Sequence, residues 1–166
     1  MRLKLGLIVV AVAACAVAAD AARAGQRSKA PAPAAEQSAT KPLAVVDGDI
    51  GDLEVALLEV KRTSGGTLTV RWQYRNKGSR GMSVGTGREV AEGSYLLDQT
   101  NKKKYLVVRD AQNQPVGANH HADVRAGSTL GTWAKFPAPP ETVERISVVV
   151  PHAPPFDDVP ISKGTP

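Results

Sequence analysis

The fold class is decided by the stretch Thr67-Leu-Thr-Val-Arg-Trp-Gln-Tyr-Arg75. Its apolar side chains, at positions 68, 70, 72 and 74, alternate with threonine, arginine and glutamine. A period of two is typical of a β-strand that turns one face to a core and the other to water. The turn-forming residues 76–81 then end the strand. This stretch therefore predicts one strand of a half-buried sheet, and we expect Trp72 to be a core residue.

Strand patterns recur on both sides of this stretch. Upstream, residues 52–62 alternate with a slip of one position at Leu57-Leu58, which indicates a β-bulge. Ser64-Gly65-Gly66 predicts the hairpin turn that joins the two strands. Further strands are predicted at residues 94–98, 104–109, 129–136 and 143–150. The prolines within residues 151–162 predict an extended tail.

These strands imply an all-β domain over residues 49–162. No segment has the 3.6-residue period of an amphipathic helix, which argues against α/β folds. Short strands separated by turns indicate a single β-sandwich of about seven strands, with a closed β-barrel as the alternative. We expect Trp133, in the strand at 129–136, to join Trp72 in the core.

The N-terminus predicts export from a bacterial cell. A short basic start, Met1-Arg-Leu-Lys4, is followed by an apolar run of the length expected for a signal-peptide core. Asp20 and Arg23 end this run before it reaches the roughly 20 residues of a membrane span. A small-x-small site before Gly25 predicts a signal peptide of residues 1–24.

Cys15 provides an alternative cleavage site for this signal peptide. The stretch Val12-Ala-Ala-Cys15 resembles the lipobox of bacterial lipoproteins, in which the cysteine is lipidated and becomes the mature N-terminus. The signal would then be residues 1–14, and lipid chains would anchor the protein. The chain has no other cysteine, so an intramolecular disulfide is impossible. Residues 25–48, rich in alanine, proline and polar side chains, predict a disordered linker.

Three segments carry a family resemblance. They are Val70-Arg-Trp-Gln-Tyr-Arg-Asn76, Tyr95-Leu-Leu-Asp98 and Trp133-Ala-Lys-Phe136-Pro-Ala-Pro-Pro140. Together they resemble bacterial exported immunoglobulin-like domains, uncharacterised lipoproteins and secreted proteins related to the extracellular immunoprotective family. The resemblance implies an immunoglobulin-like β-sandwich located in the envelope or outside the cell. It transfers no catalytic residue.

Few side chains suggest a metal-binding, ligand-binding or catalytic site. The pair His120-His121 is the best metal candidate, and His152 could complete a zinc or copper site, since such a site needs three or four donors. The glycine-rich stretch 82–89 predicts a mobile loop, in which Met82 and Arg88 are candidates for binding. We find no pattern of a catalytic nucleophile and expect neither an enzyme nor a cofactor.

The expected function follows by elimination. The net charge of +5 is modest, and the lysines at 102–104 form one short basic run, so we expect no nucleic-acid partner. We expect a non-enzymatic cell-envelope or secreted module that binds another envelope or extracellular protein, or has a structural role. It would be periplasmic, an outer-membrane lipoprotein or secreted, and would touch the membrane only through Cys15. A periplasmic metal-binding protein using His120 and His121 is the alternative, and an inhibitor of an exported hydrolase is a third.

Overall fold

The computed structural model describes residues 41–63 and 65–164. All of them belong to one compact unit. The predicted signal peptide, Cys15 and most of the predicted linker lie outside the described residues. Within the described part, no helix is both long and apolar enough to cross a membrane.

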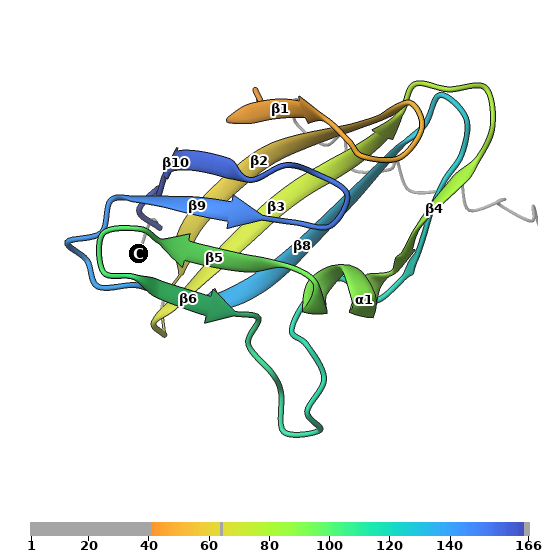
Figure 1. Ribbon diagram of the computed structural model, residues 1–166. Helices are drawn as coiled ribbons and strands as arrows, with labels where there is room; N and C mark the ends of the chain where they lie inside the picture. The colour runs from red at the N-terminus through yellow and green to blue at the C-terminus, as the bar shows by residue number, and fades with distance from the viewer. Residues whose placement is uncertain (1–40, 64, 165–166) are drawn as a thin grey trace, which may run out of the picture. The chain divides into compact units, whose positions relative to one another are not determined.

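The fold is an all-β sandwich of two four-stranded antiparallel sheets packed face to face (Figure 1). Sheet 1 has the strand order β1 (Ala44–Asp47), β2 (Leu53–Thr63), β3 (Thr67–Asn76) and β8 (Thr129–Pro137). Sheet 2 has the order β10 (Phe156–Pro160), β9 (Arg145–Val149), β5 (Tyr95–Asp98) and β6 (Lys103–Leu106). A small third sheet pairs β4 (Met82–Thr86) with β7 (His121–Val124), next to the short helix α1 (Gly87–Glu92).

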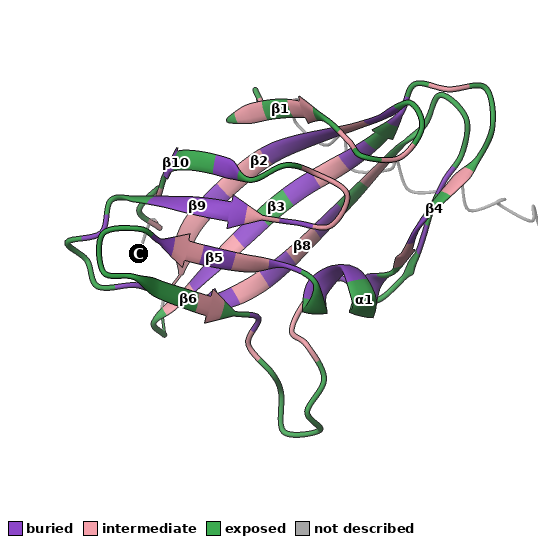
Figure 2. Cartoon of the chain, in the orientation of Figure 1, coloured by how far each residue is buried: buried purple, intermediate pink, exposed green. Residues whose placement is uncertain are grey.

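Strand β3 supplies the centre of the core. Its side chains at 68, 70, 72 and 74 are buried, while Arg71 and Arg75 on the other face are exposed. The buried and exposed bands that alternate along β3 are visible in Figure 2. The predicted bulge is confirmed, because the β2–β3 register shifts between Leu57 and Glu59. The predicted hairpin is also confirmed, with Gly65 and Gly66 at φ of 92° and 71°, which favour glycine.

Segments outside the named strands join the two sheets along both sides. On one side, the chain leaving β6 reaches β8, where the Val108 N–H donates to the Lys135 carbonyl at 2.8 Å. On the other side, the chain leaving β10 reaches β2, where the Ser162 N–H donates to the Val60 carbonyl at 2.8 Å. The outer strand β8 and the second half of β2, which β1 does not cover, thereby find partners for their backbone groups, as sheet edges require.

Two predicted boundaries are wrong because short strands lie where we expected irregular chain. Strand β1 falls inside the predicted linker 25–48, since Ala44, Val45 and Val46 pair with the first half of β2. The ordered domain therefore begins before residue 49. The predicted extended tail contains β10, which pairs with β9 at the edge of sheet 2. An edge strand tolerates Pro160, because its missing N–H need not face a neighbour.

The stretch 82–89, predicted as a mobile loop, instead forms β4 and the start of α1. A capping box begins the helix: the Thr86 side chain accepts from the Glu89 N–H at 3.2 Å, and the Glu89 carboxylate accepts from the Thr86 N–H at 2.7 Å. These two bonds satisfy donors that the first helical turn leaves free. The chain consequently has ten strands and one helix within the described residues, against the roughly seven strands expected.

Arg62, at the end of β2, holds the connection between β8 and β9. Its guanidinium donates to the carbonyls of Pro139 (2.7 Å), Pro140 (2.9 Å) and Val143 (2.9 Å). Replacing Arg62 by alanine should lower the free energy of unfolding by about 2 kcal/mol, because three carbonyls lose a charged donor. Urea denaturation checks this. The matched control is Arg71→Ala, since Arg71 is exposed and makes no hydrogen bond to the described side chains; equal losses in the two variants would contradict this role of Arg62.

Candidate binding groove

A groove of about 1270 Å³ lies on the outer face of sheet 1. Side chains of β2, β3 and β8 form its base, and segments from elsewhere in the chain form its two sides. One side is the segment 117–120, and the other consists of residues 42–43 and 160–162. The groove is thus assembled from six separate parts of the sequence.

The base of the groove is built from neighbouring cross-strand pairs. Trp133, Arg71 and Glu59 are successive partners across β8, β3 and β2, so their side chains share the outer face. In the next row, Gly131 is the partner of Gln73. A Cβ placed on Gly131 would meet no atom within 4 Å, so the missing side chain leaves open space beside Trp133.

Backbone contacts fix the sides of the groove. The Ala118 N–H donates to the Trp133 carbonyl at 2.9 Å, which holds segment 117–120 against β8. Helix α1 also holds this segment in place, because the Gly87 N–H donates to the His120 carbonyl at 2.7 Å. A Cβ on Gly87 would lie 2.8 Å from the His120 nitrogen, so glycine is required for this close approach. Across the groove, the Leu43 N–H donates to the Leu57 carbonyl at 2.7 Å.

The groove combines an aromatic ring with both signs of charge. Trp133 is half-buried, so part of its indole is open to solvent. Arg71 is exposed and Glu59 half-buried, and neither makes an ion pair with another described residue. Leu43, which is 45% exposed, adds apolar surface at the side. Such a surface can contact apolar, acidic and basic groups of a ligand at once.

Trp133 therefore does not lie in the core, and the expectation that it joins Trp72 there is wrong. In β8 the buried positions are Thr132, Ala134 and Phe136, so a residue between them must face outward. Trp72, on the inward face of β3, is fully buried as expected. The two tryptophans lie on opposite faces of sheet 1.

The structure does not bring the three candidate histidines together as a metal site. His120 and His121 are exposed, and His120 lies at the side of the groove. His152, between β9 and β10, is half-buried, with its Nδ1 3.0 Å from a carboxylate oxygen of Asp49. Among residues 41–63 and 65–164, no group of three or more His, Cys, Asp or Glu side chains is placed to hold a metal ion.

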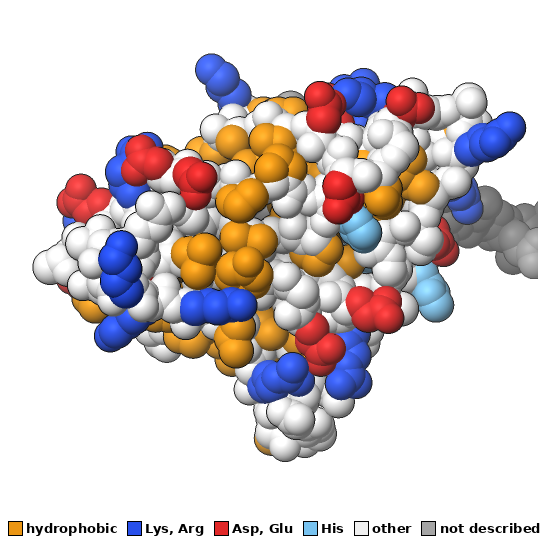
Figure 3. All heavy atoms as spheres, in the orientation of Figure 1, with side chains coloured by type: hydrophobic (Ala, Val, Ile, Leu, Met, Phe, Trp, Pro, Cys, Tyr) orange, Lys and Arg blue, Asp and Glu red, His pale blue; other side chains and the backbone are white. Residues whose placement is uncertain are grey.

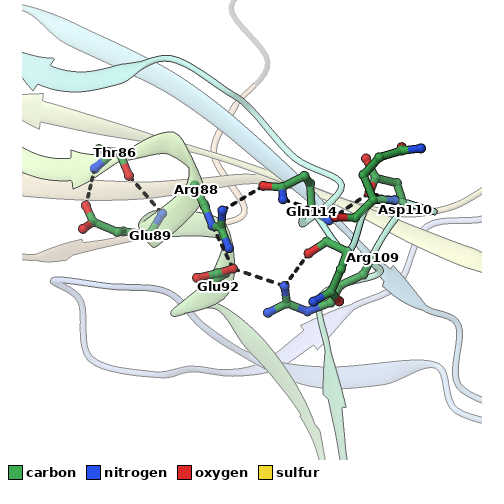
Figure 4. A network of polar contacts seen from close by, with 9 residues as sticks. Thr86, Arg88, Glu89, Glu92, Arg109, Asp110 and Gln114 are labelled. Carbon is green, nitrogen blue, oxygen red and sulfur yellow. Dashed lines mark hydrogen bonds and ion pairs between the residues drawn. The ribbon is translucent and has the colours of Figure 1, made fainter.

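The candidate loop residues Met82 and Arg88 lie outside the groove. Arg88, on α1, contacts Glu92 (3.1 Å) and donates to the Gln114 side chain (2.9 Å), as Figure 4 shows. Glu92 also pairs with Arg109 at 3.2 Å. This network ties α1 to the connection between β6 and β7. Met82, on β4, is half-buried and packs against the core.

Several side chains have shifted pKa values because of their roles in the fold. The Thr86 N–H and hydroxyl lower the pKa of Glu89 in the helix cap, and the Asn101 side-chain and backbone N–H groups lower the pKa of Asp98 in the β5–β6 turn. Burial raises the pKa of Tyr74, whose hydroxyl donates to the Pro151 carbonyl at 3.1 Å, and it also raises the pKa of Tyr105. None of these four side chains lines the groove.

Searches for similar proteins found no matching family model, no matching curated protein and no matching solved structure.

Proposed function

We propose that this chain is a non-enzymatic cell-envelope or secreted module that binds another protein through the groove on sheet 1. The observation that carries this proposal is the outward-facing Trp133 beside the open space at Gly131. Tryptophan and arginine are the residues that most often dominate protein–protein binding energy, and here Trp133 and Arg71 are cross-strand partners.

The dimensions and composition of the groove favour a polypeptide ligand. Its volume, about 1270 Å³, exceeds the roughly 300–1000 Å³ typical of sites for small molecules. Its polar groups are spread along the lining, where an extended chain could meet them one after another, and apolar side chains stand between them. A partly exposed aromatic ring in a groove is also a typical contact for a side chain of a partner protein.

Replacing Trp133 by alanine should remove most of this binding. Tagged wild-type and variant proteins would be used to capture partners from envelope extract, with the captured proteins quantified by mass spectrometry. A specific partner should fall at least about tenfold in the Trp133→Ala sample, as expected for loss of a binding hot spot. The matched control is Val45→Ala, which removes a 49% exposed side chain from β1, outside the groove lining. Equal recovery with both variants would refute a role for the groove.

We propose further that the protein is exported and that Cys15, if lipidated, anchors it to a membrane. The support is the lipobox-like stretch ending at Cys15, which lies outside the described residues. A Cys15→Ser variant expressed in bacteria should move from the membrane fraction to the soluble exported fraction, because the thiol is the only site of lipid attachment in such a signal. Immunoblotting of the fractions measures this, and mass spectrometry of the mature N-terminus identifies the lipid. An unchanged membrane fraction would rule out the lipid anchor.

A further inference from the structure

The outer face of sheet 2 carries a row of uncovered apolar side chains. Val149, Tyr95 and Leu106 are successive cross-strand partners on β9, β5 and β6. Val149 and Tyr95 are partly exposed, and Leu106 is 60% exposed, more than any other large hydrophobic side chain of the described residues. Leu97 lies in the next row of the same face, also partly exposed. Hydrophobic side chains gather over the middle of this face in Figure 3.

Charges of opposite sign border this apolar row. On the β6 side, Lys103 and Lys104 are exposed, and the Lys104 ammonium lies 3.7 Å from the centre of the Tyr95 ring. On the β10 side, Asp157 is exposed and accepts a 3.3 Å hydrogen bond from Gln99. None of these three side chains forms an ion pair within the part of the chain that the structure describes. In Figure 3, basic side chains lie beside β6, and acidic side chains lie beside β10 together with basic ones. The arginine at that edge, Arg145, is paired with Asp158 at 2.6 Å.

We propose that two copies of this chain associate through the outer faces of sheet 2, around a two-fold axis that runs parallel to the strands. A two-fold axis makes an interface self-complementary, so each residue meets the same partner in both copies. Rotation about an axis along the strands exchanges the two edges of the face. Lys104 on β6 of one copy then opposes Asp157 of the other, and Tyr95 opposes Val149.

The charges also select this axis over its alternative. A two-fold axis running across the strands would place Lys104 opposite the lysine region of the second copy and Asp157 opposite its own acidic edge. Like charges facing each other in an interface disfavour association. The arrangement of charge thus favours a second copy of this chain as the partner of this face. It also fixes the orientation of the two copies.

The size of the face predicts a weak dimer. Four strands of four or five residues give a face of about 15 Å by 15 Å, or about 225 Å². This area is well below the roughly 800 Å² per partner that stable complexes bury. We therefore expect dissociation in the micromolar range. The groove on sheet 1 lies on the opposite side of the sandwich, so a dimer would carry two open grooves and bind a repeated or clustered partner more tightly than one copy does. The dimer does not depend on the proposed function of the groove.

Sedimentation equilibrium of the purified protein over a range of concentrations tests the proposal. The wild-type protein should pass from monomer to dimer as its concentration rises. Leu106→Asp should weaken the dimer at least tenfold, because it places a charge in the apolar row, while Leu43→Asp on sheet 1 should leave it unchanged. Far-ultraviolet circular dichroism and urea denaturation confirm that each variant is folded.

A charge-reversal series tests the orientation. Lys104→Glu and Asp157→Lys should each weaken the dimer, since each brings like charges together, and the double variant should restore it. A wild-type protein that stays monomeric at all concentrations overturns the proposal, as does a dimer unaffected by Leu106→Asp or weakened equally by Leu43→Asp. Failure of the double variant to restore association overturns the proposed axis. Loss of partner capture in Trp133→Ala, measured separately, leaves this result unaffected.

Discussion

Replacing Trp72 by alanine should lower the free energy of unfolding by about 3 to 5 kcal/mol, a large fraction of the stability of a domain of this size. The Trp72 side chain is fully buried between the sheets, and its cross-strand partners are Leu57 on β2 and Thr132 on β8. Removing the ring would leave a cavity that these fixed strands cannot close. Urea denaturation followed by circular dichroism measures the change.

The matched control is Trp133→Ala, the same chemical change on the other face of sheet 1. Because Trp133 is only half-buried, its loss should cost less than about 1.5 kcal/mol. A second comparison is Trp72→Phe. The Trp72 indole N–H has no hydrogen-bond acceptor among the described residues, so phenylalanine removes an unsatisfied donor while keeping most of the ring. Equal destabilisation by Trp72→Ala and Trp133→Ala would contradict the opposite placement of the two rings.

Replacing Gly131 by leucine should abolish capture of the groove partner while leaving the fold intact. A side chain at this position meets open space, and Gly131 does not have the positive φ that would strain other residues. The new side chain would fill the hollow beside Trp133, and we expect binding to weaken by about 30-fold or more, the effect of a central hot spot. Recovery of the partner from envelope extract measures the loss.

Thr129→Leu is the matched control for this variant. Thr129 lies on the same strand and the same face as Gly131, two residues away, and does not line the groove. It should therefore retain the partner, and both variants should unfold at the same urea concentration as the wild-type protein. Capture that survives Gly131→Leu would mean that the partner binds elsewhere.

Local patterns in the sequence predicted the centre of the fold because strand period and turn chemistry act over a few residues. The alternation of β3, the bulge at Leu57-Leu58 and the turn at Gly65-Gly66 are all of this kind. The same rule, applied to β8, would also have placed Trp133 correctly. Trp133 and Phe136 are three positions apart, so they cannot share one face of a regular strand.

The short strands were harder to predict, since tertiary pairing forms them. Strand β1 has only four residues and depends on β2, while β10 includes a proline and depends on β9. The groove as a whole could not be predicted, because its sides come from residues 42–43, 117–120 and 160–162, which are far apart in the sequence. One local feature did point to it: Gly131 inside a strand pattern marks a place where a ligand or another chain can approach closely.

Site-specific photo-crosslinking in living cells tests the binding role of the groove most directly. A photoreactive amino acid would replace Gln73, on the base of the groove, or Arg75, two residues further along the same face of β3 and outside the groove lining. We predict a discrete adduct with one other protein from position 73, absent from position 75 and lost when Gly131→Leu is added. No adduct from position 73, the same adducts from both positions, or an adduct that persists in the Gly131→Leu background would contradict the proposal that this groove binds a protein.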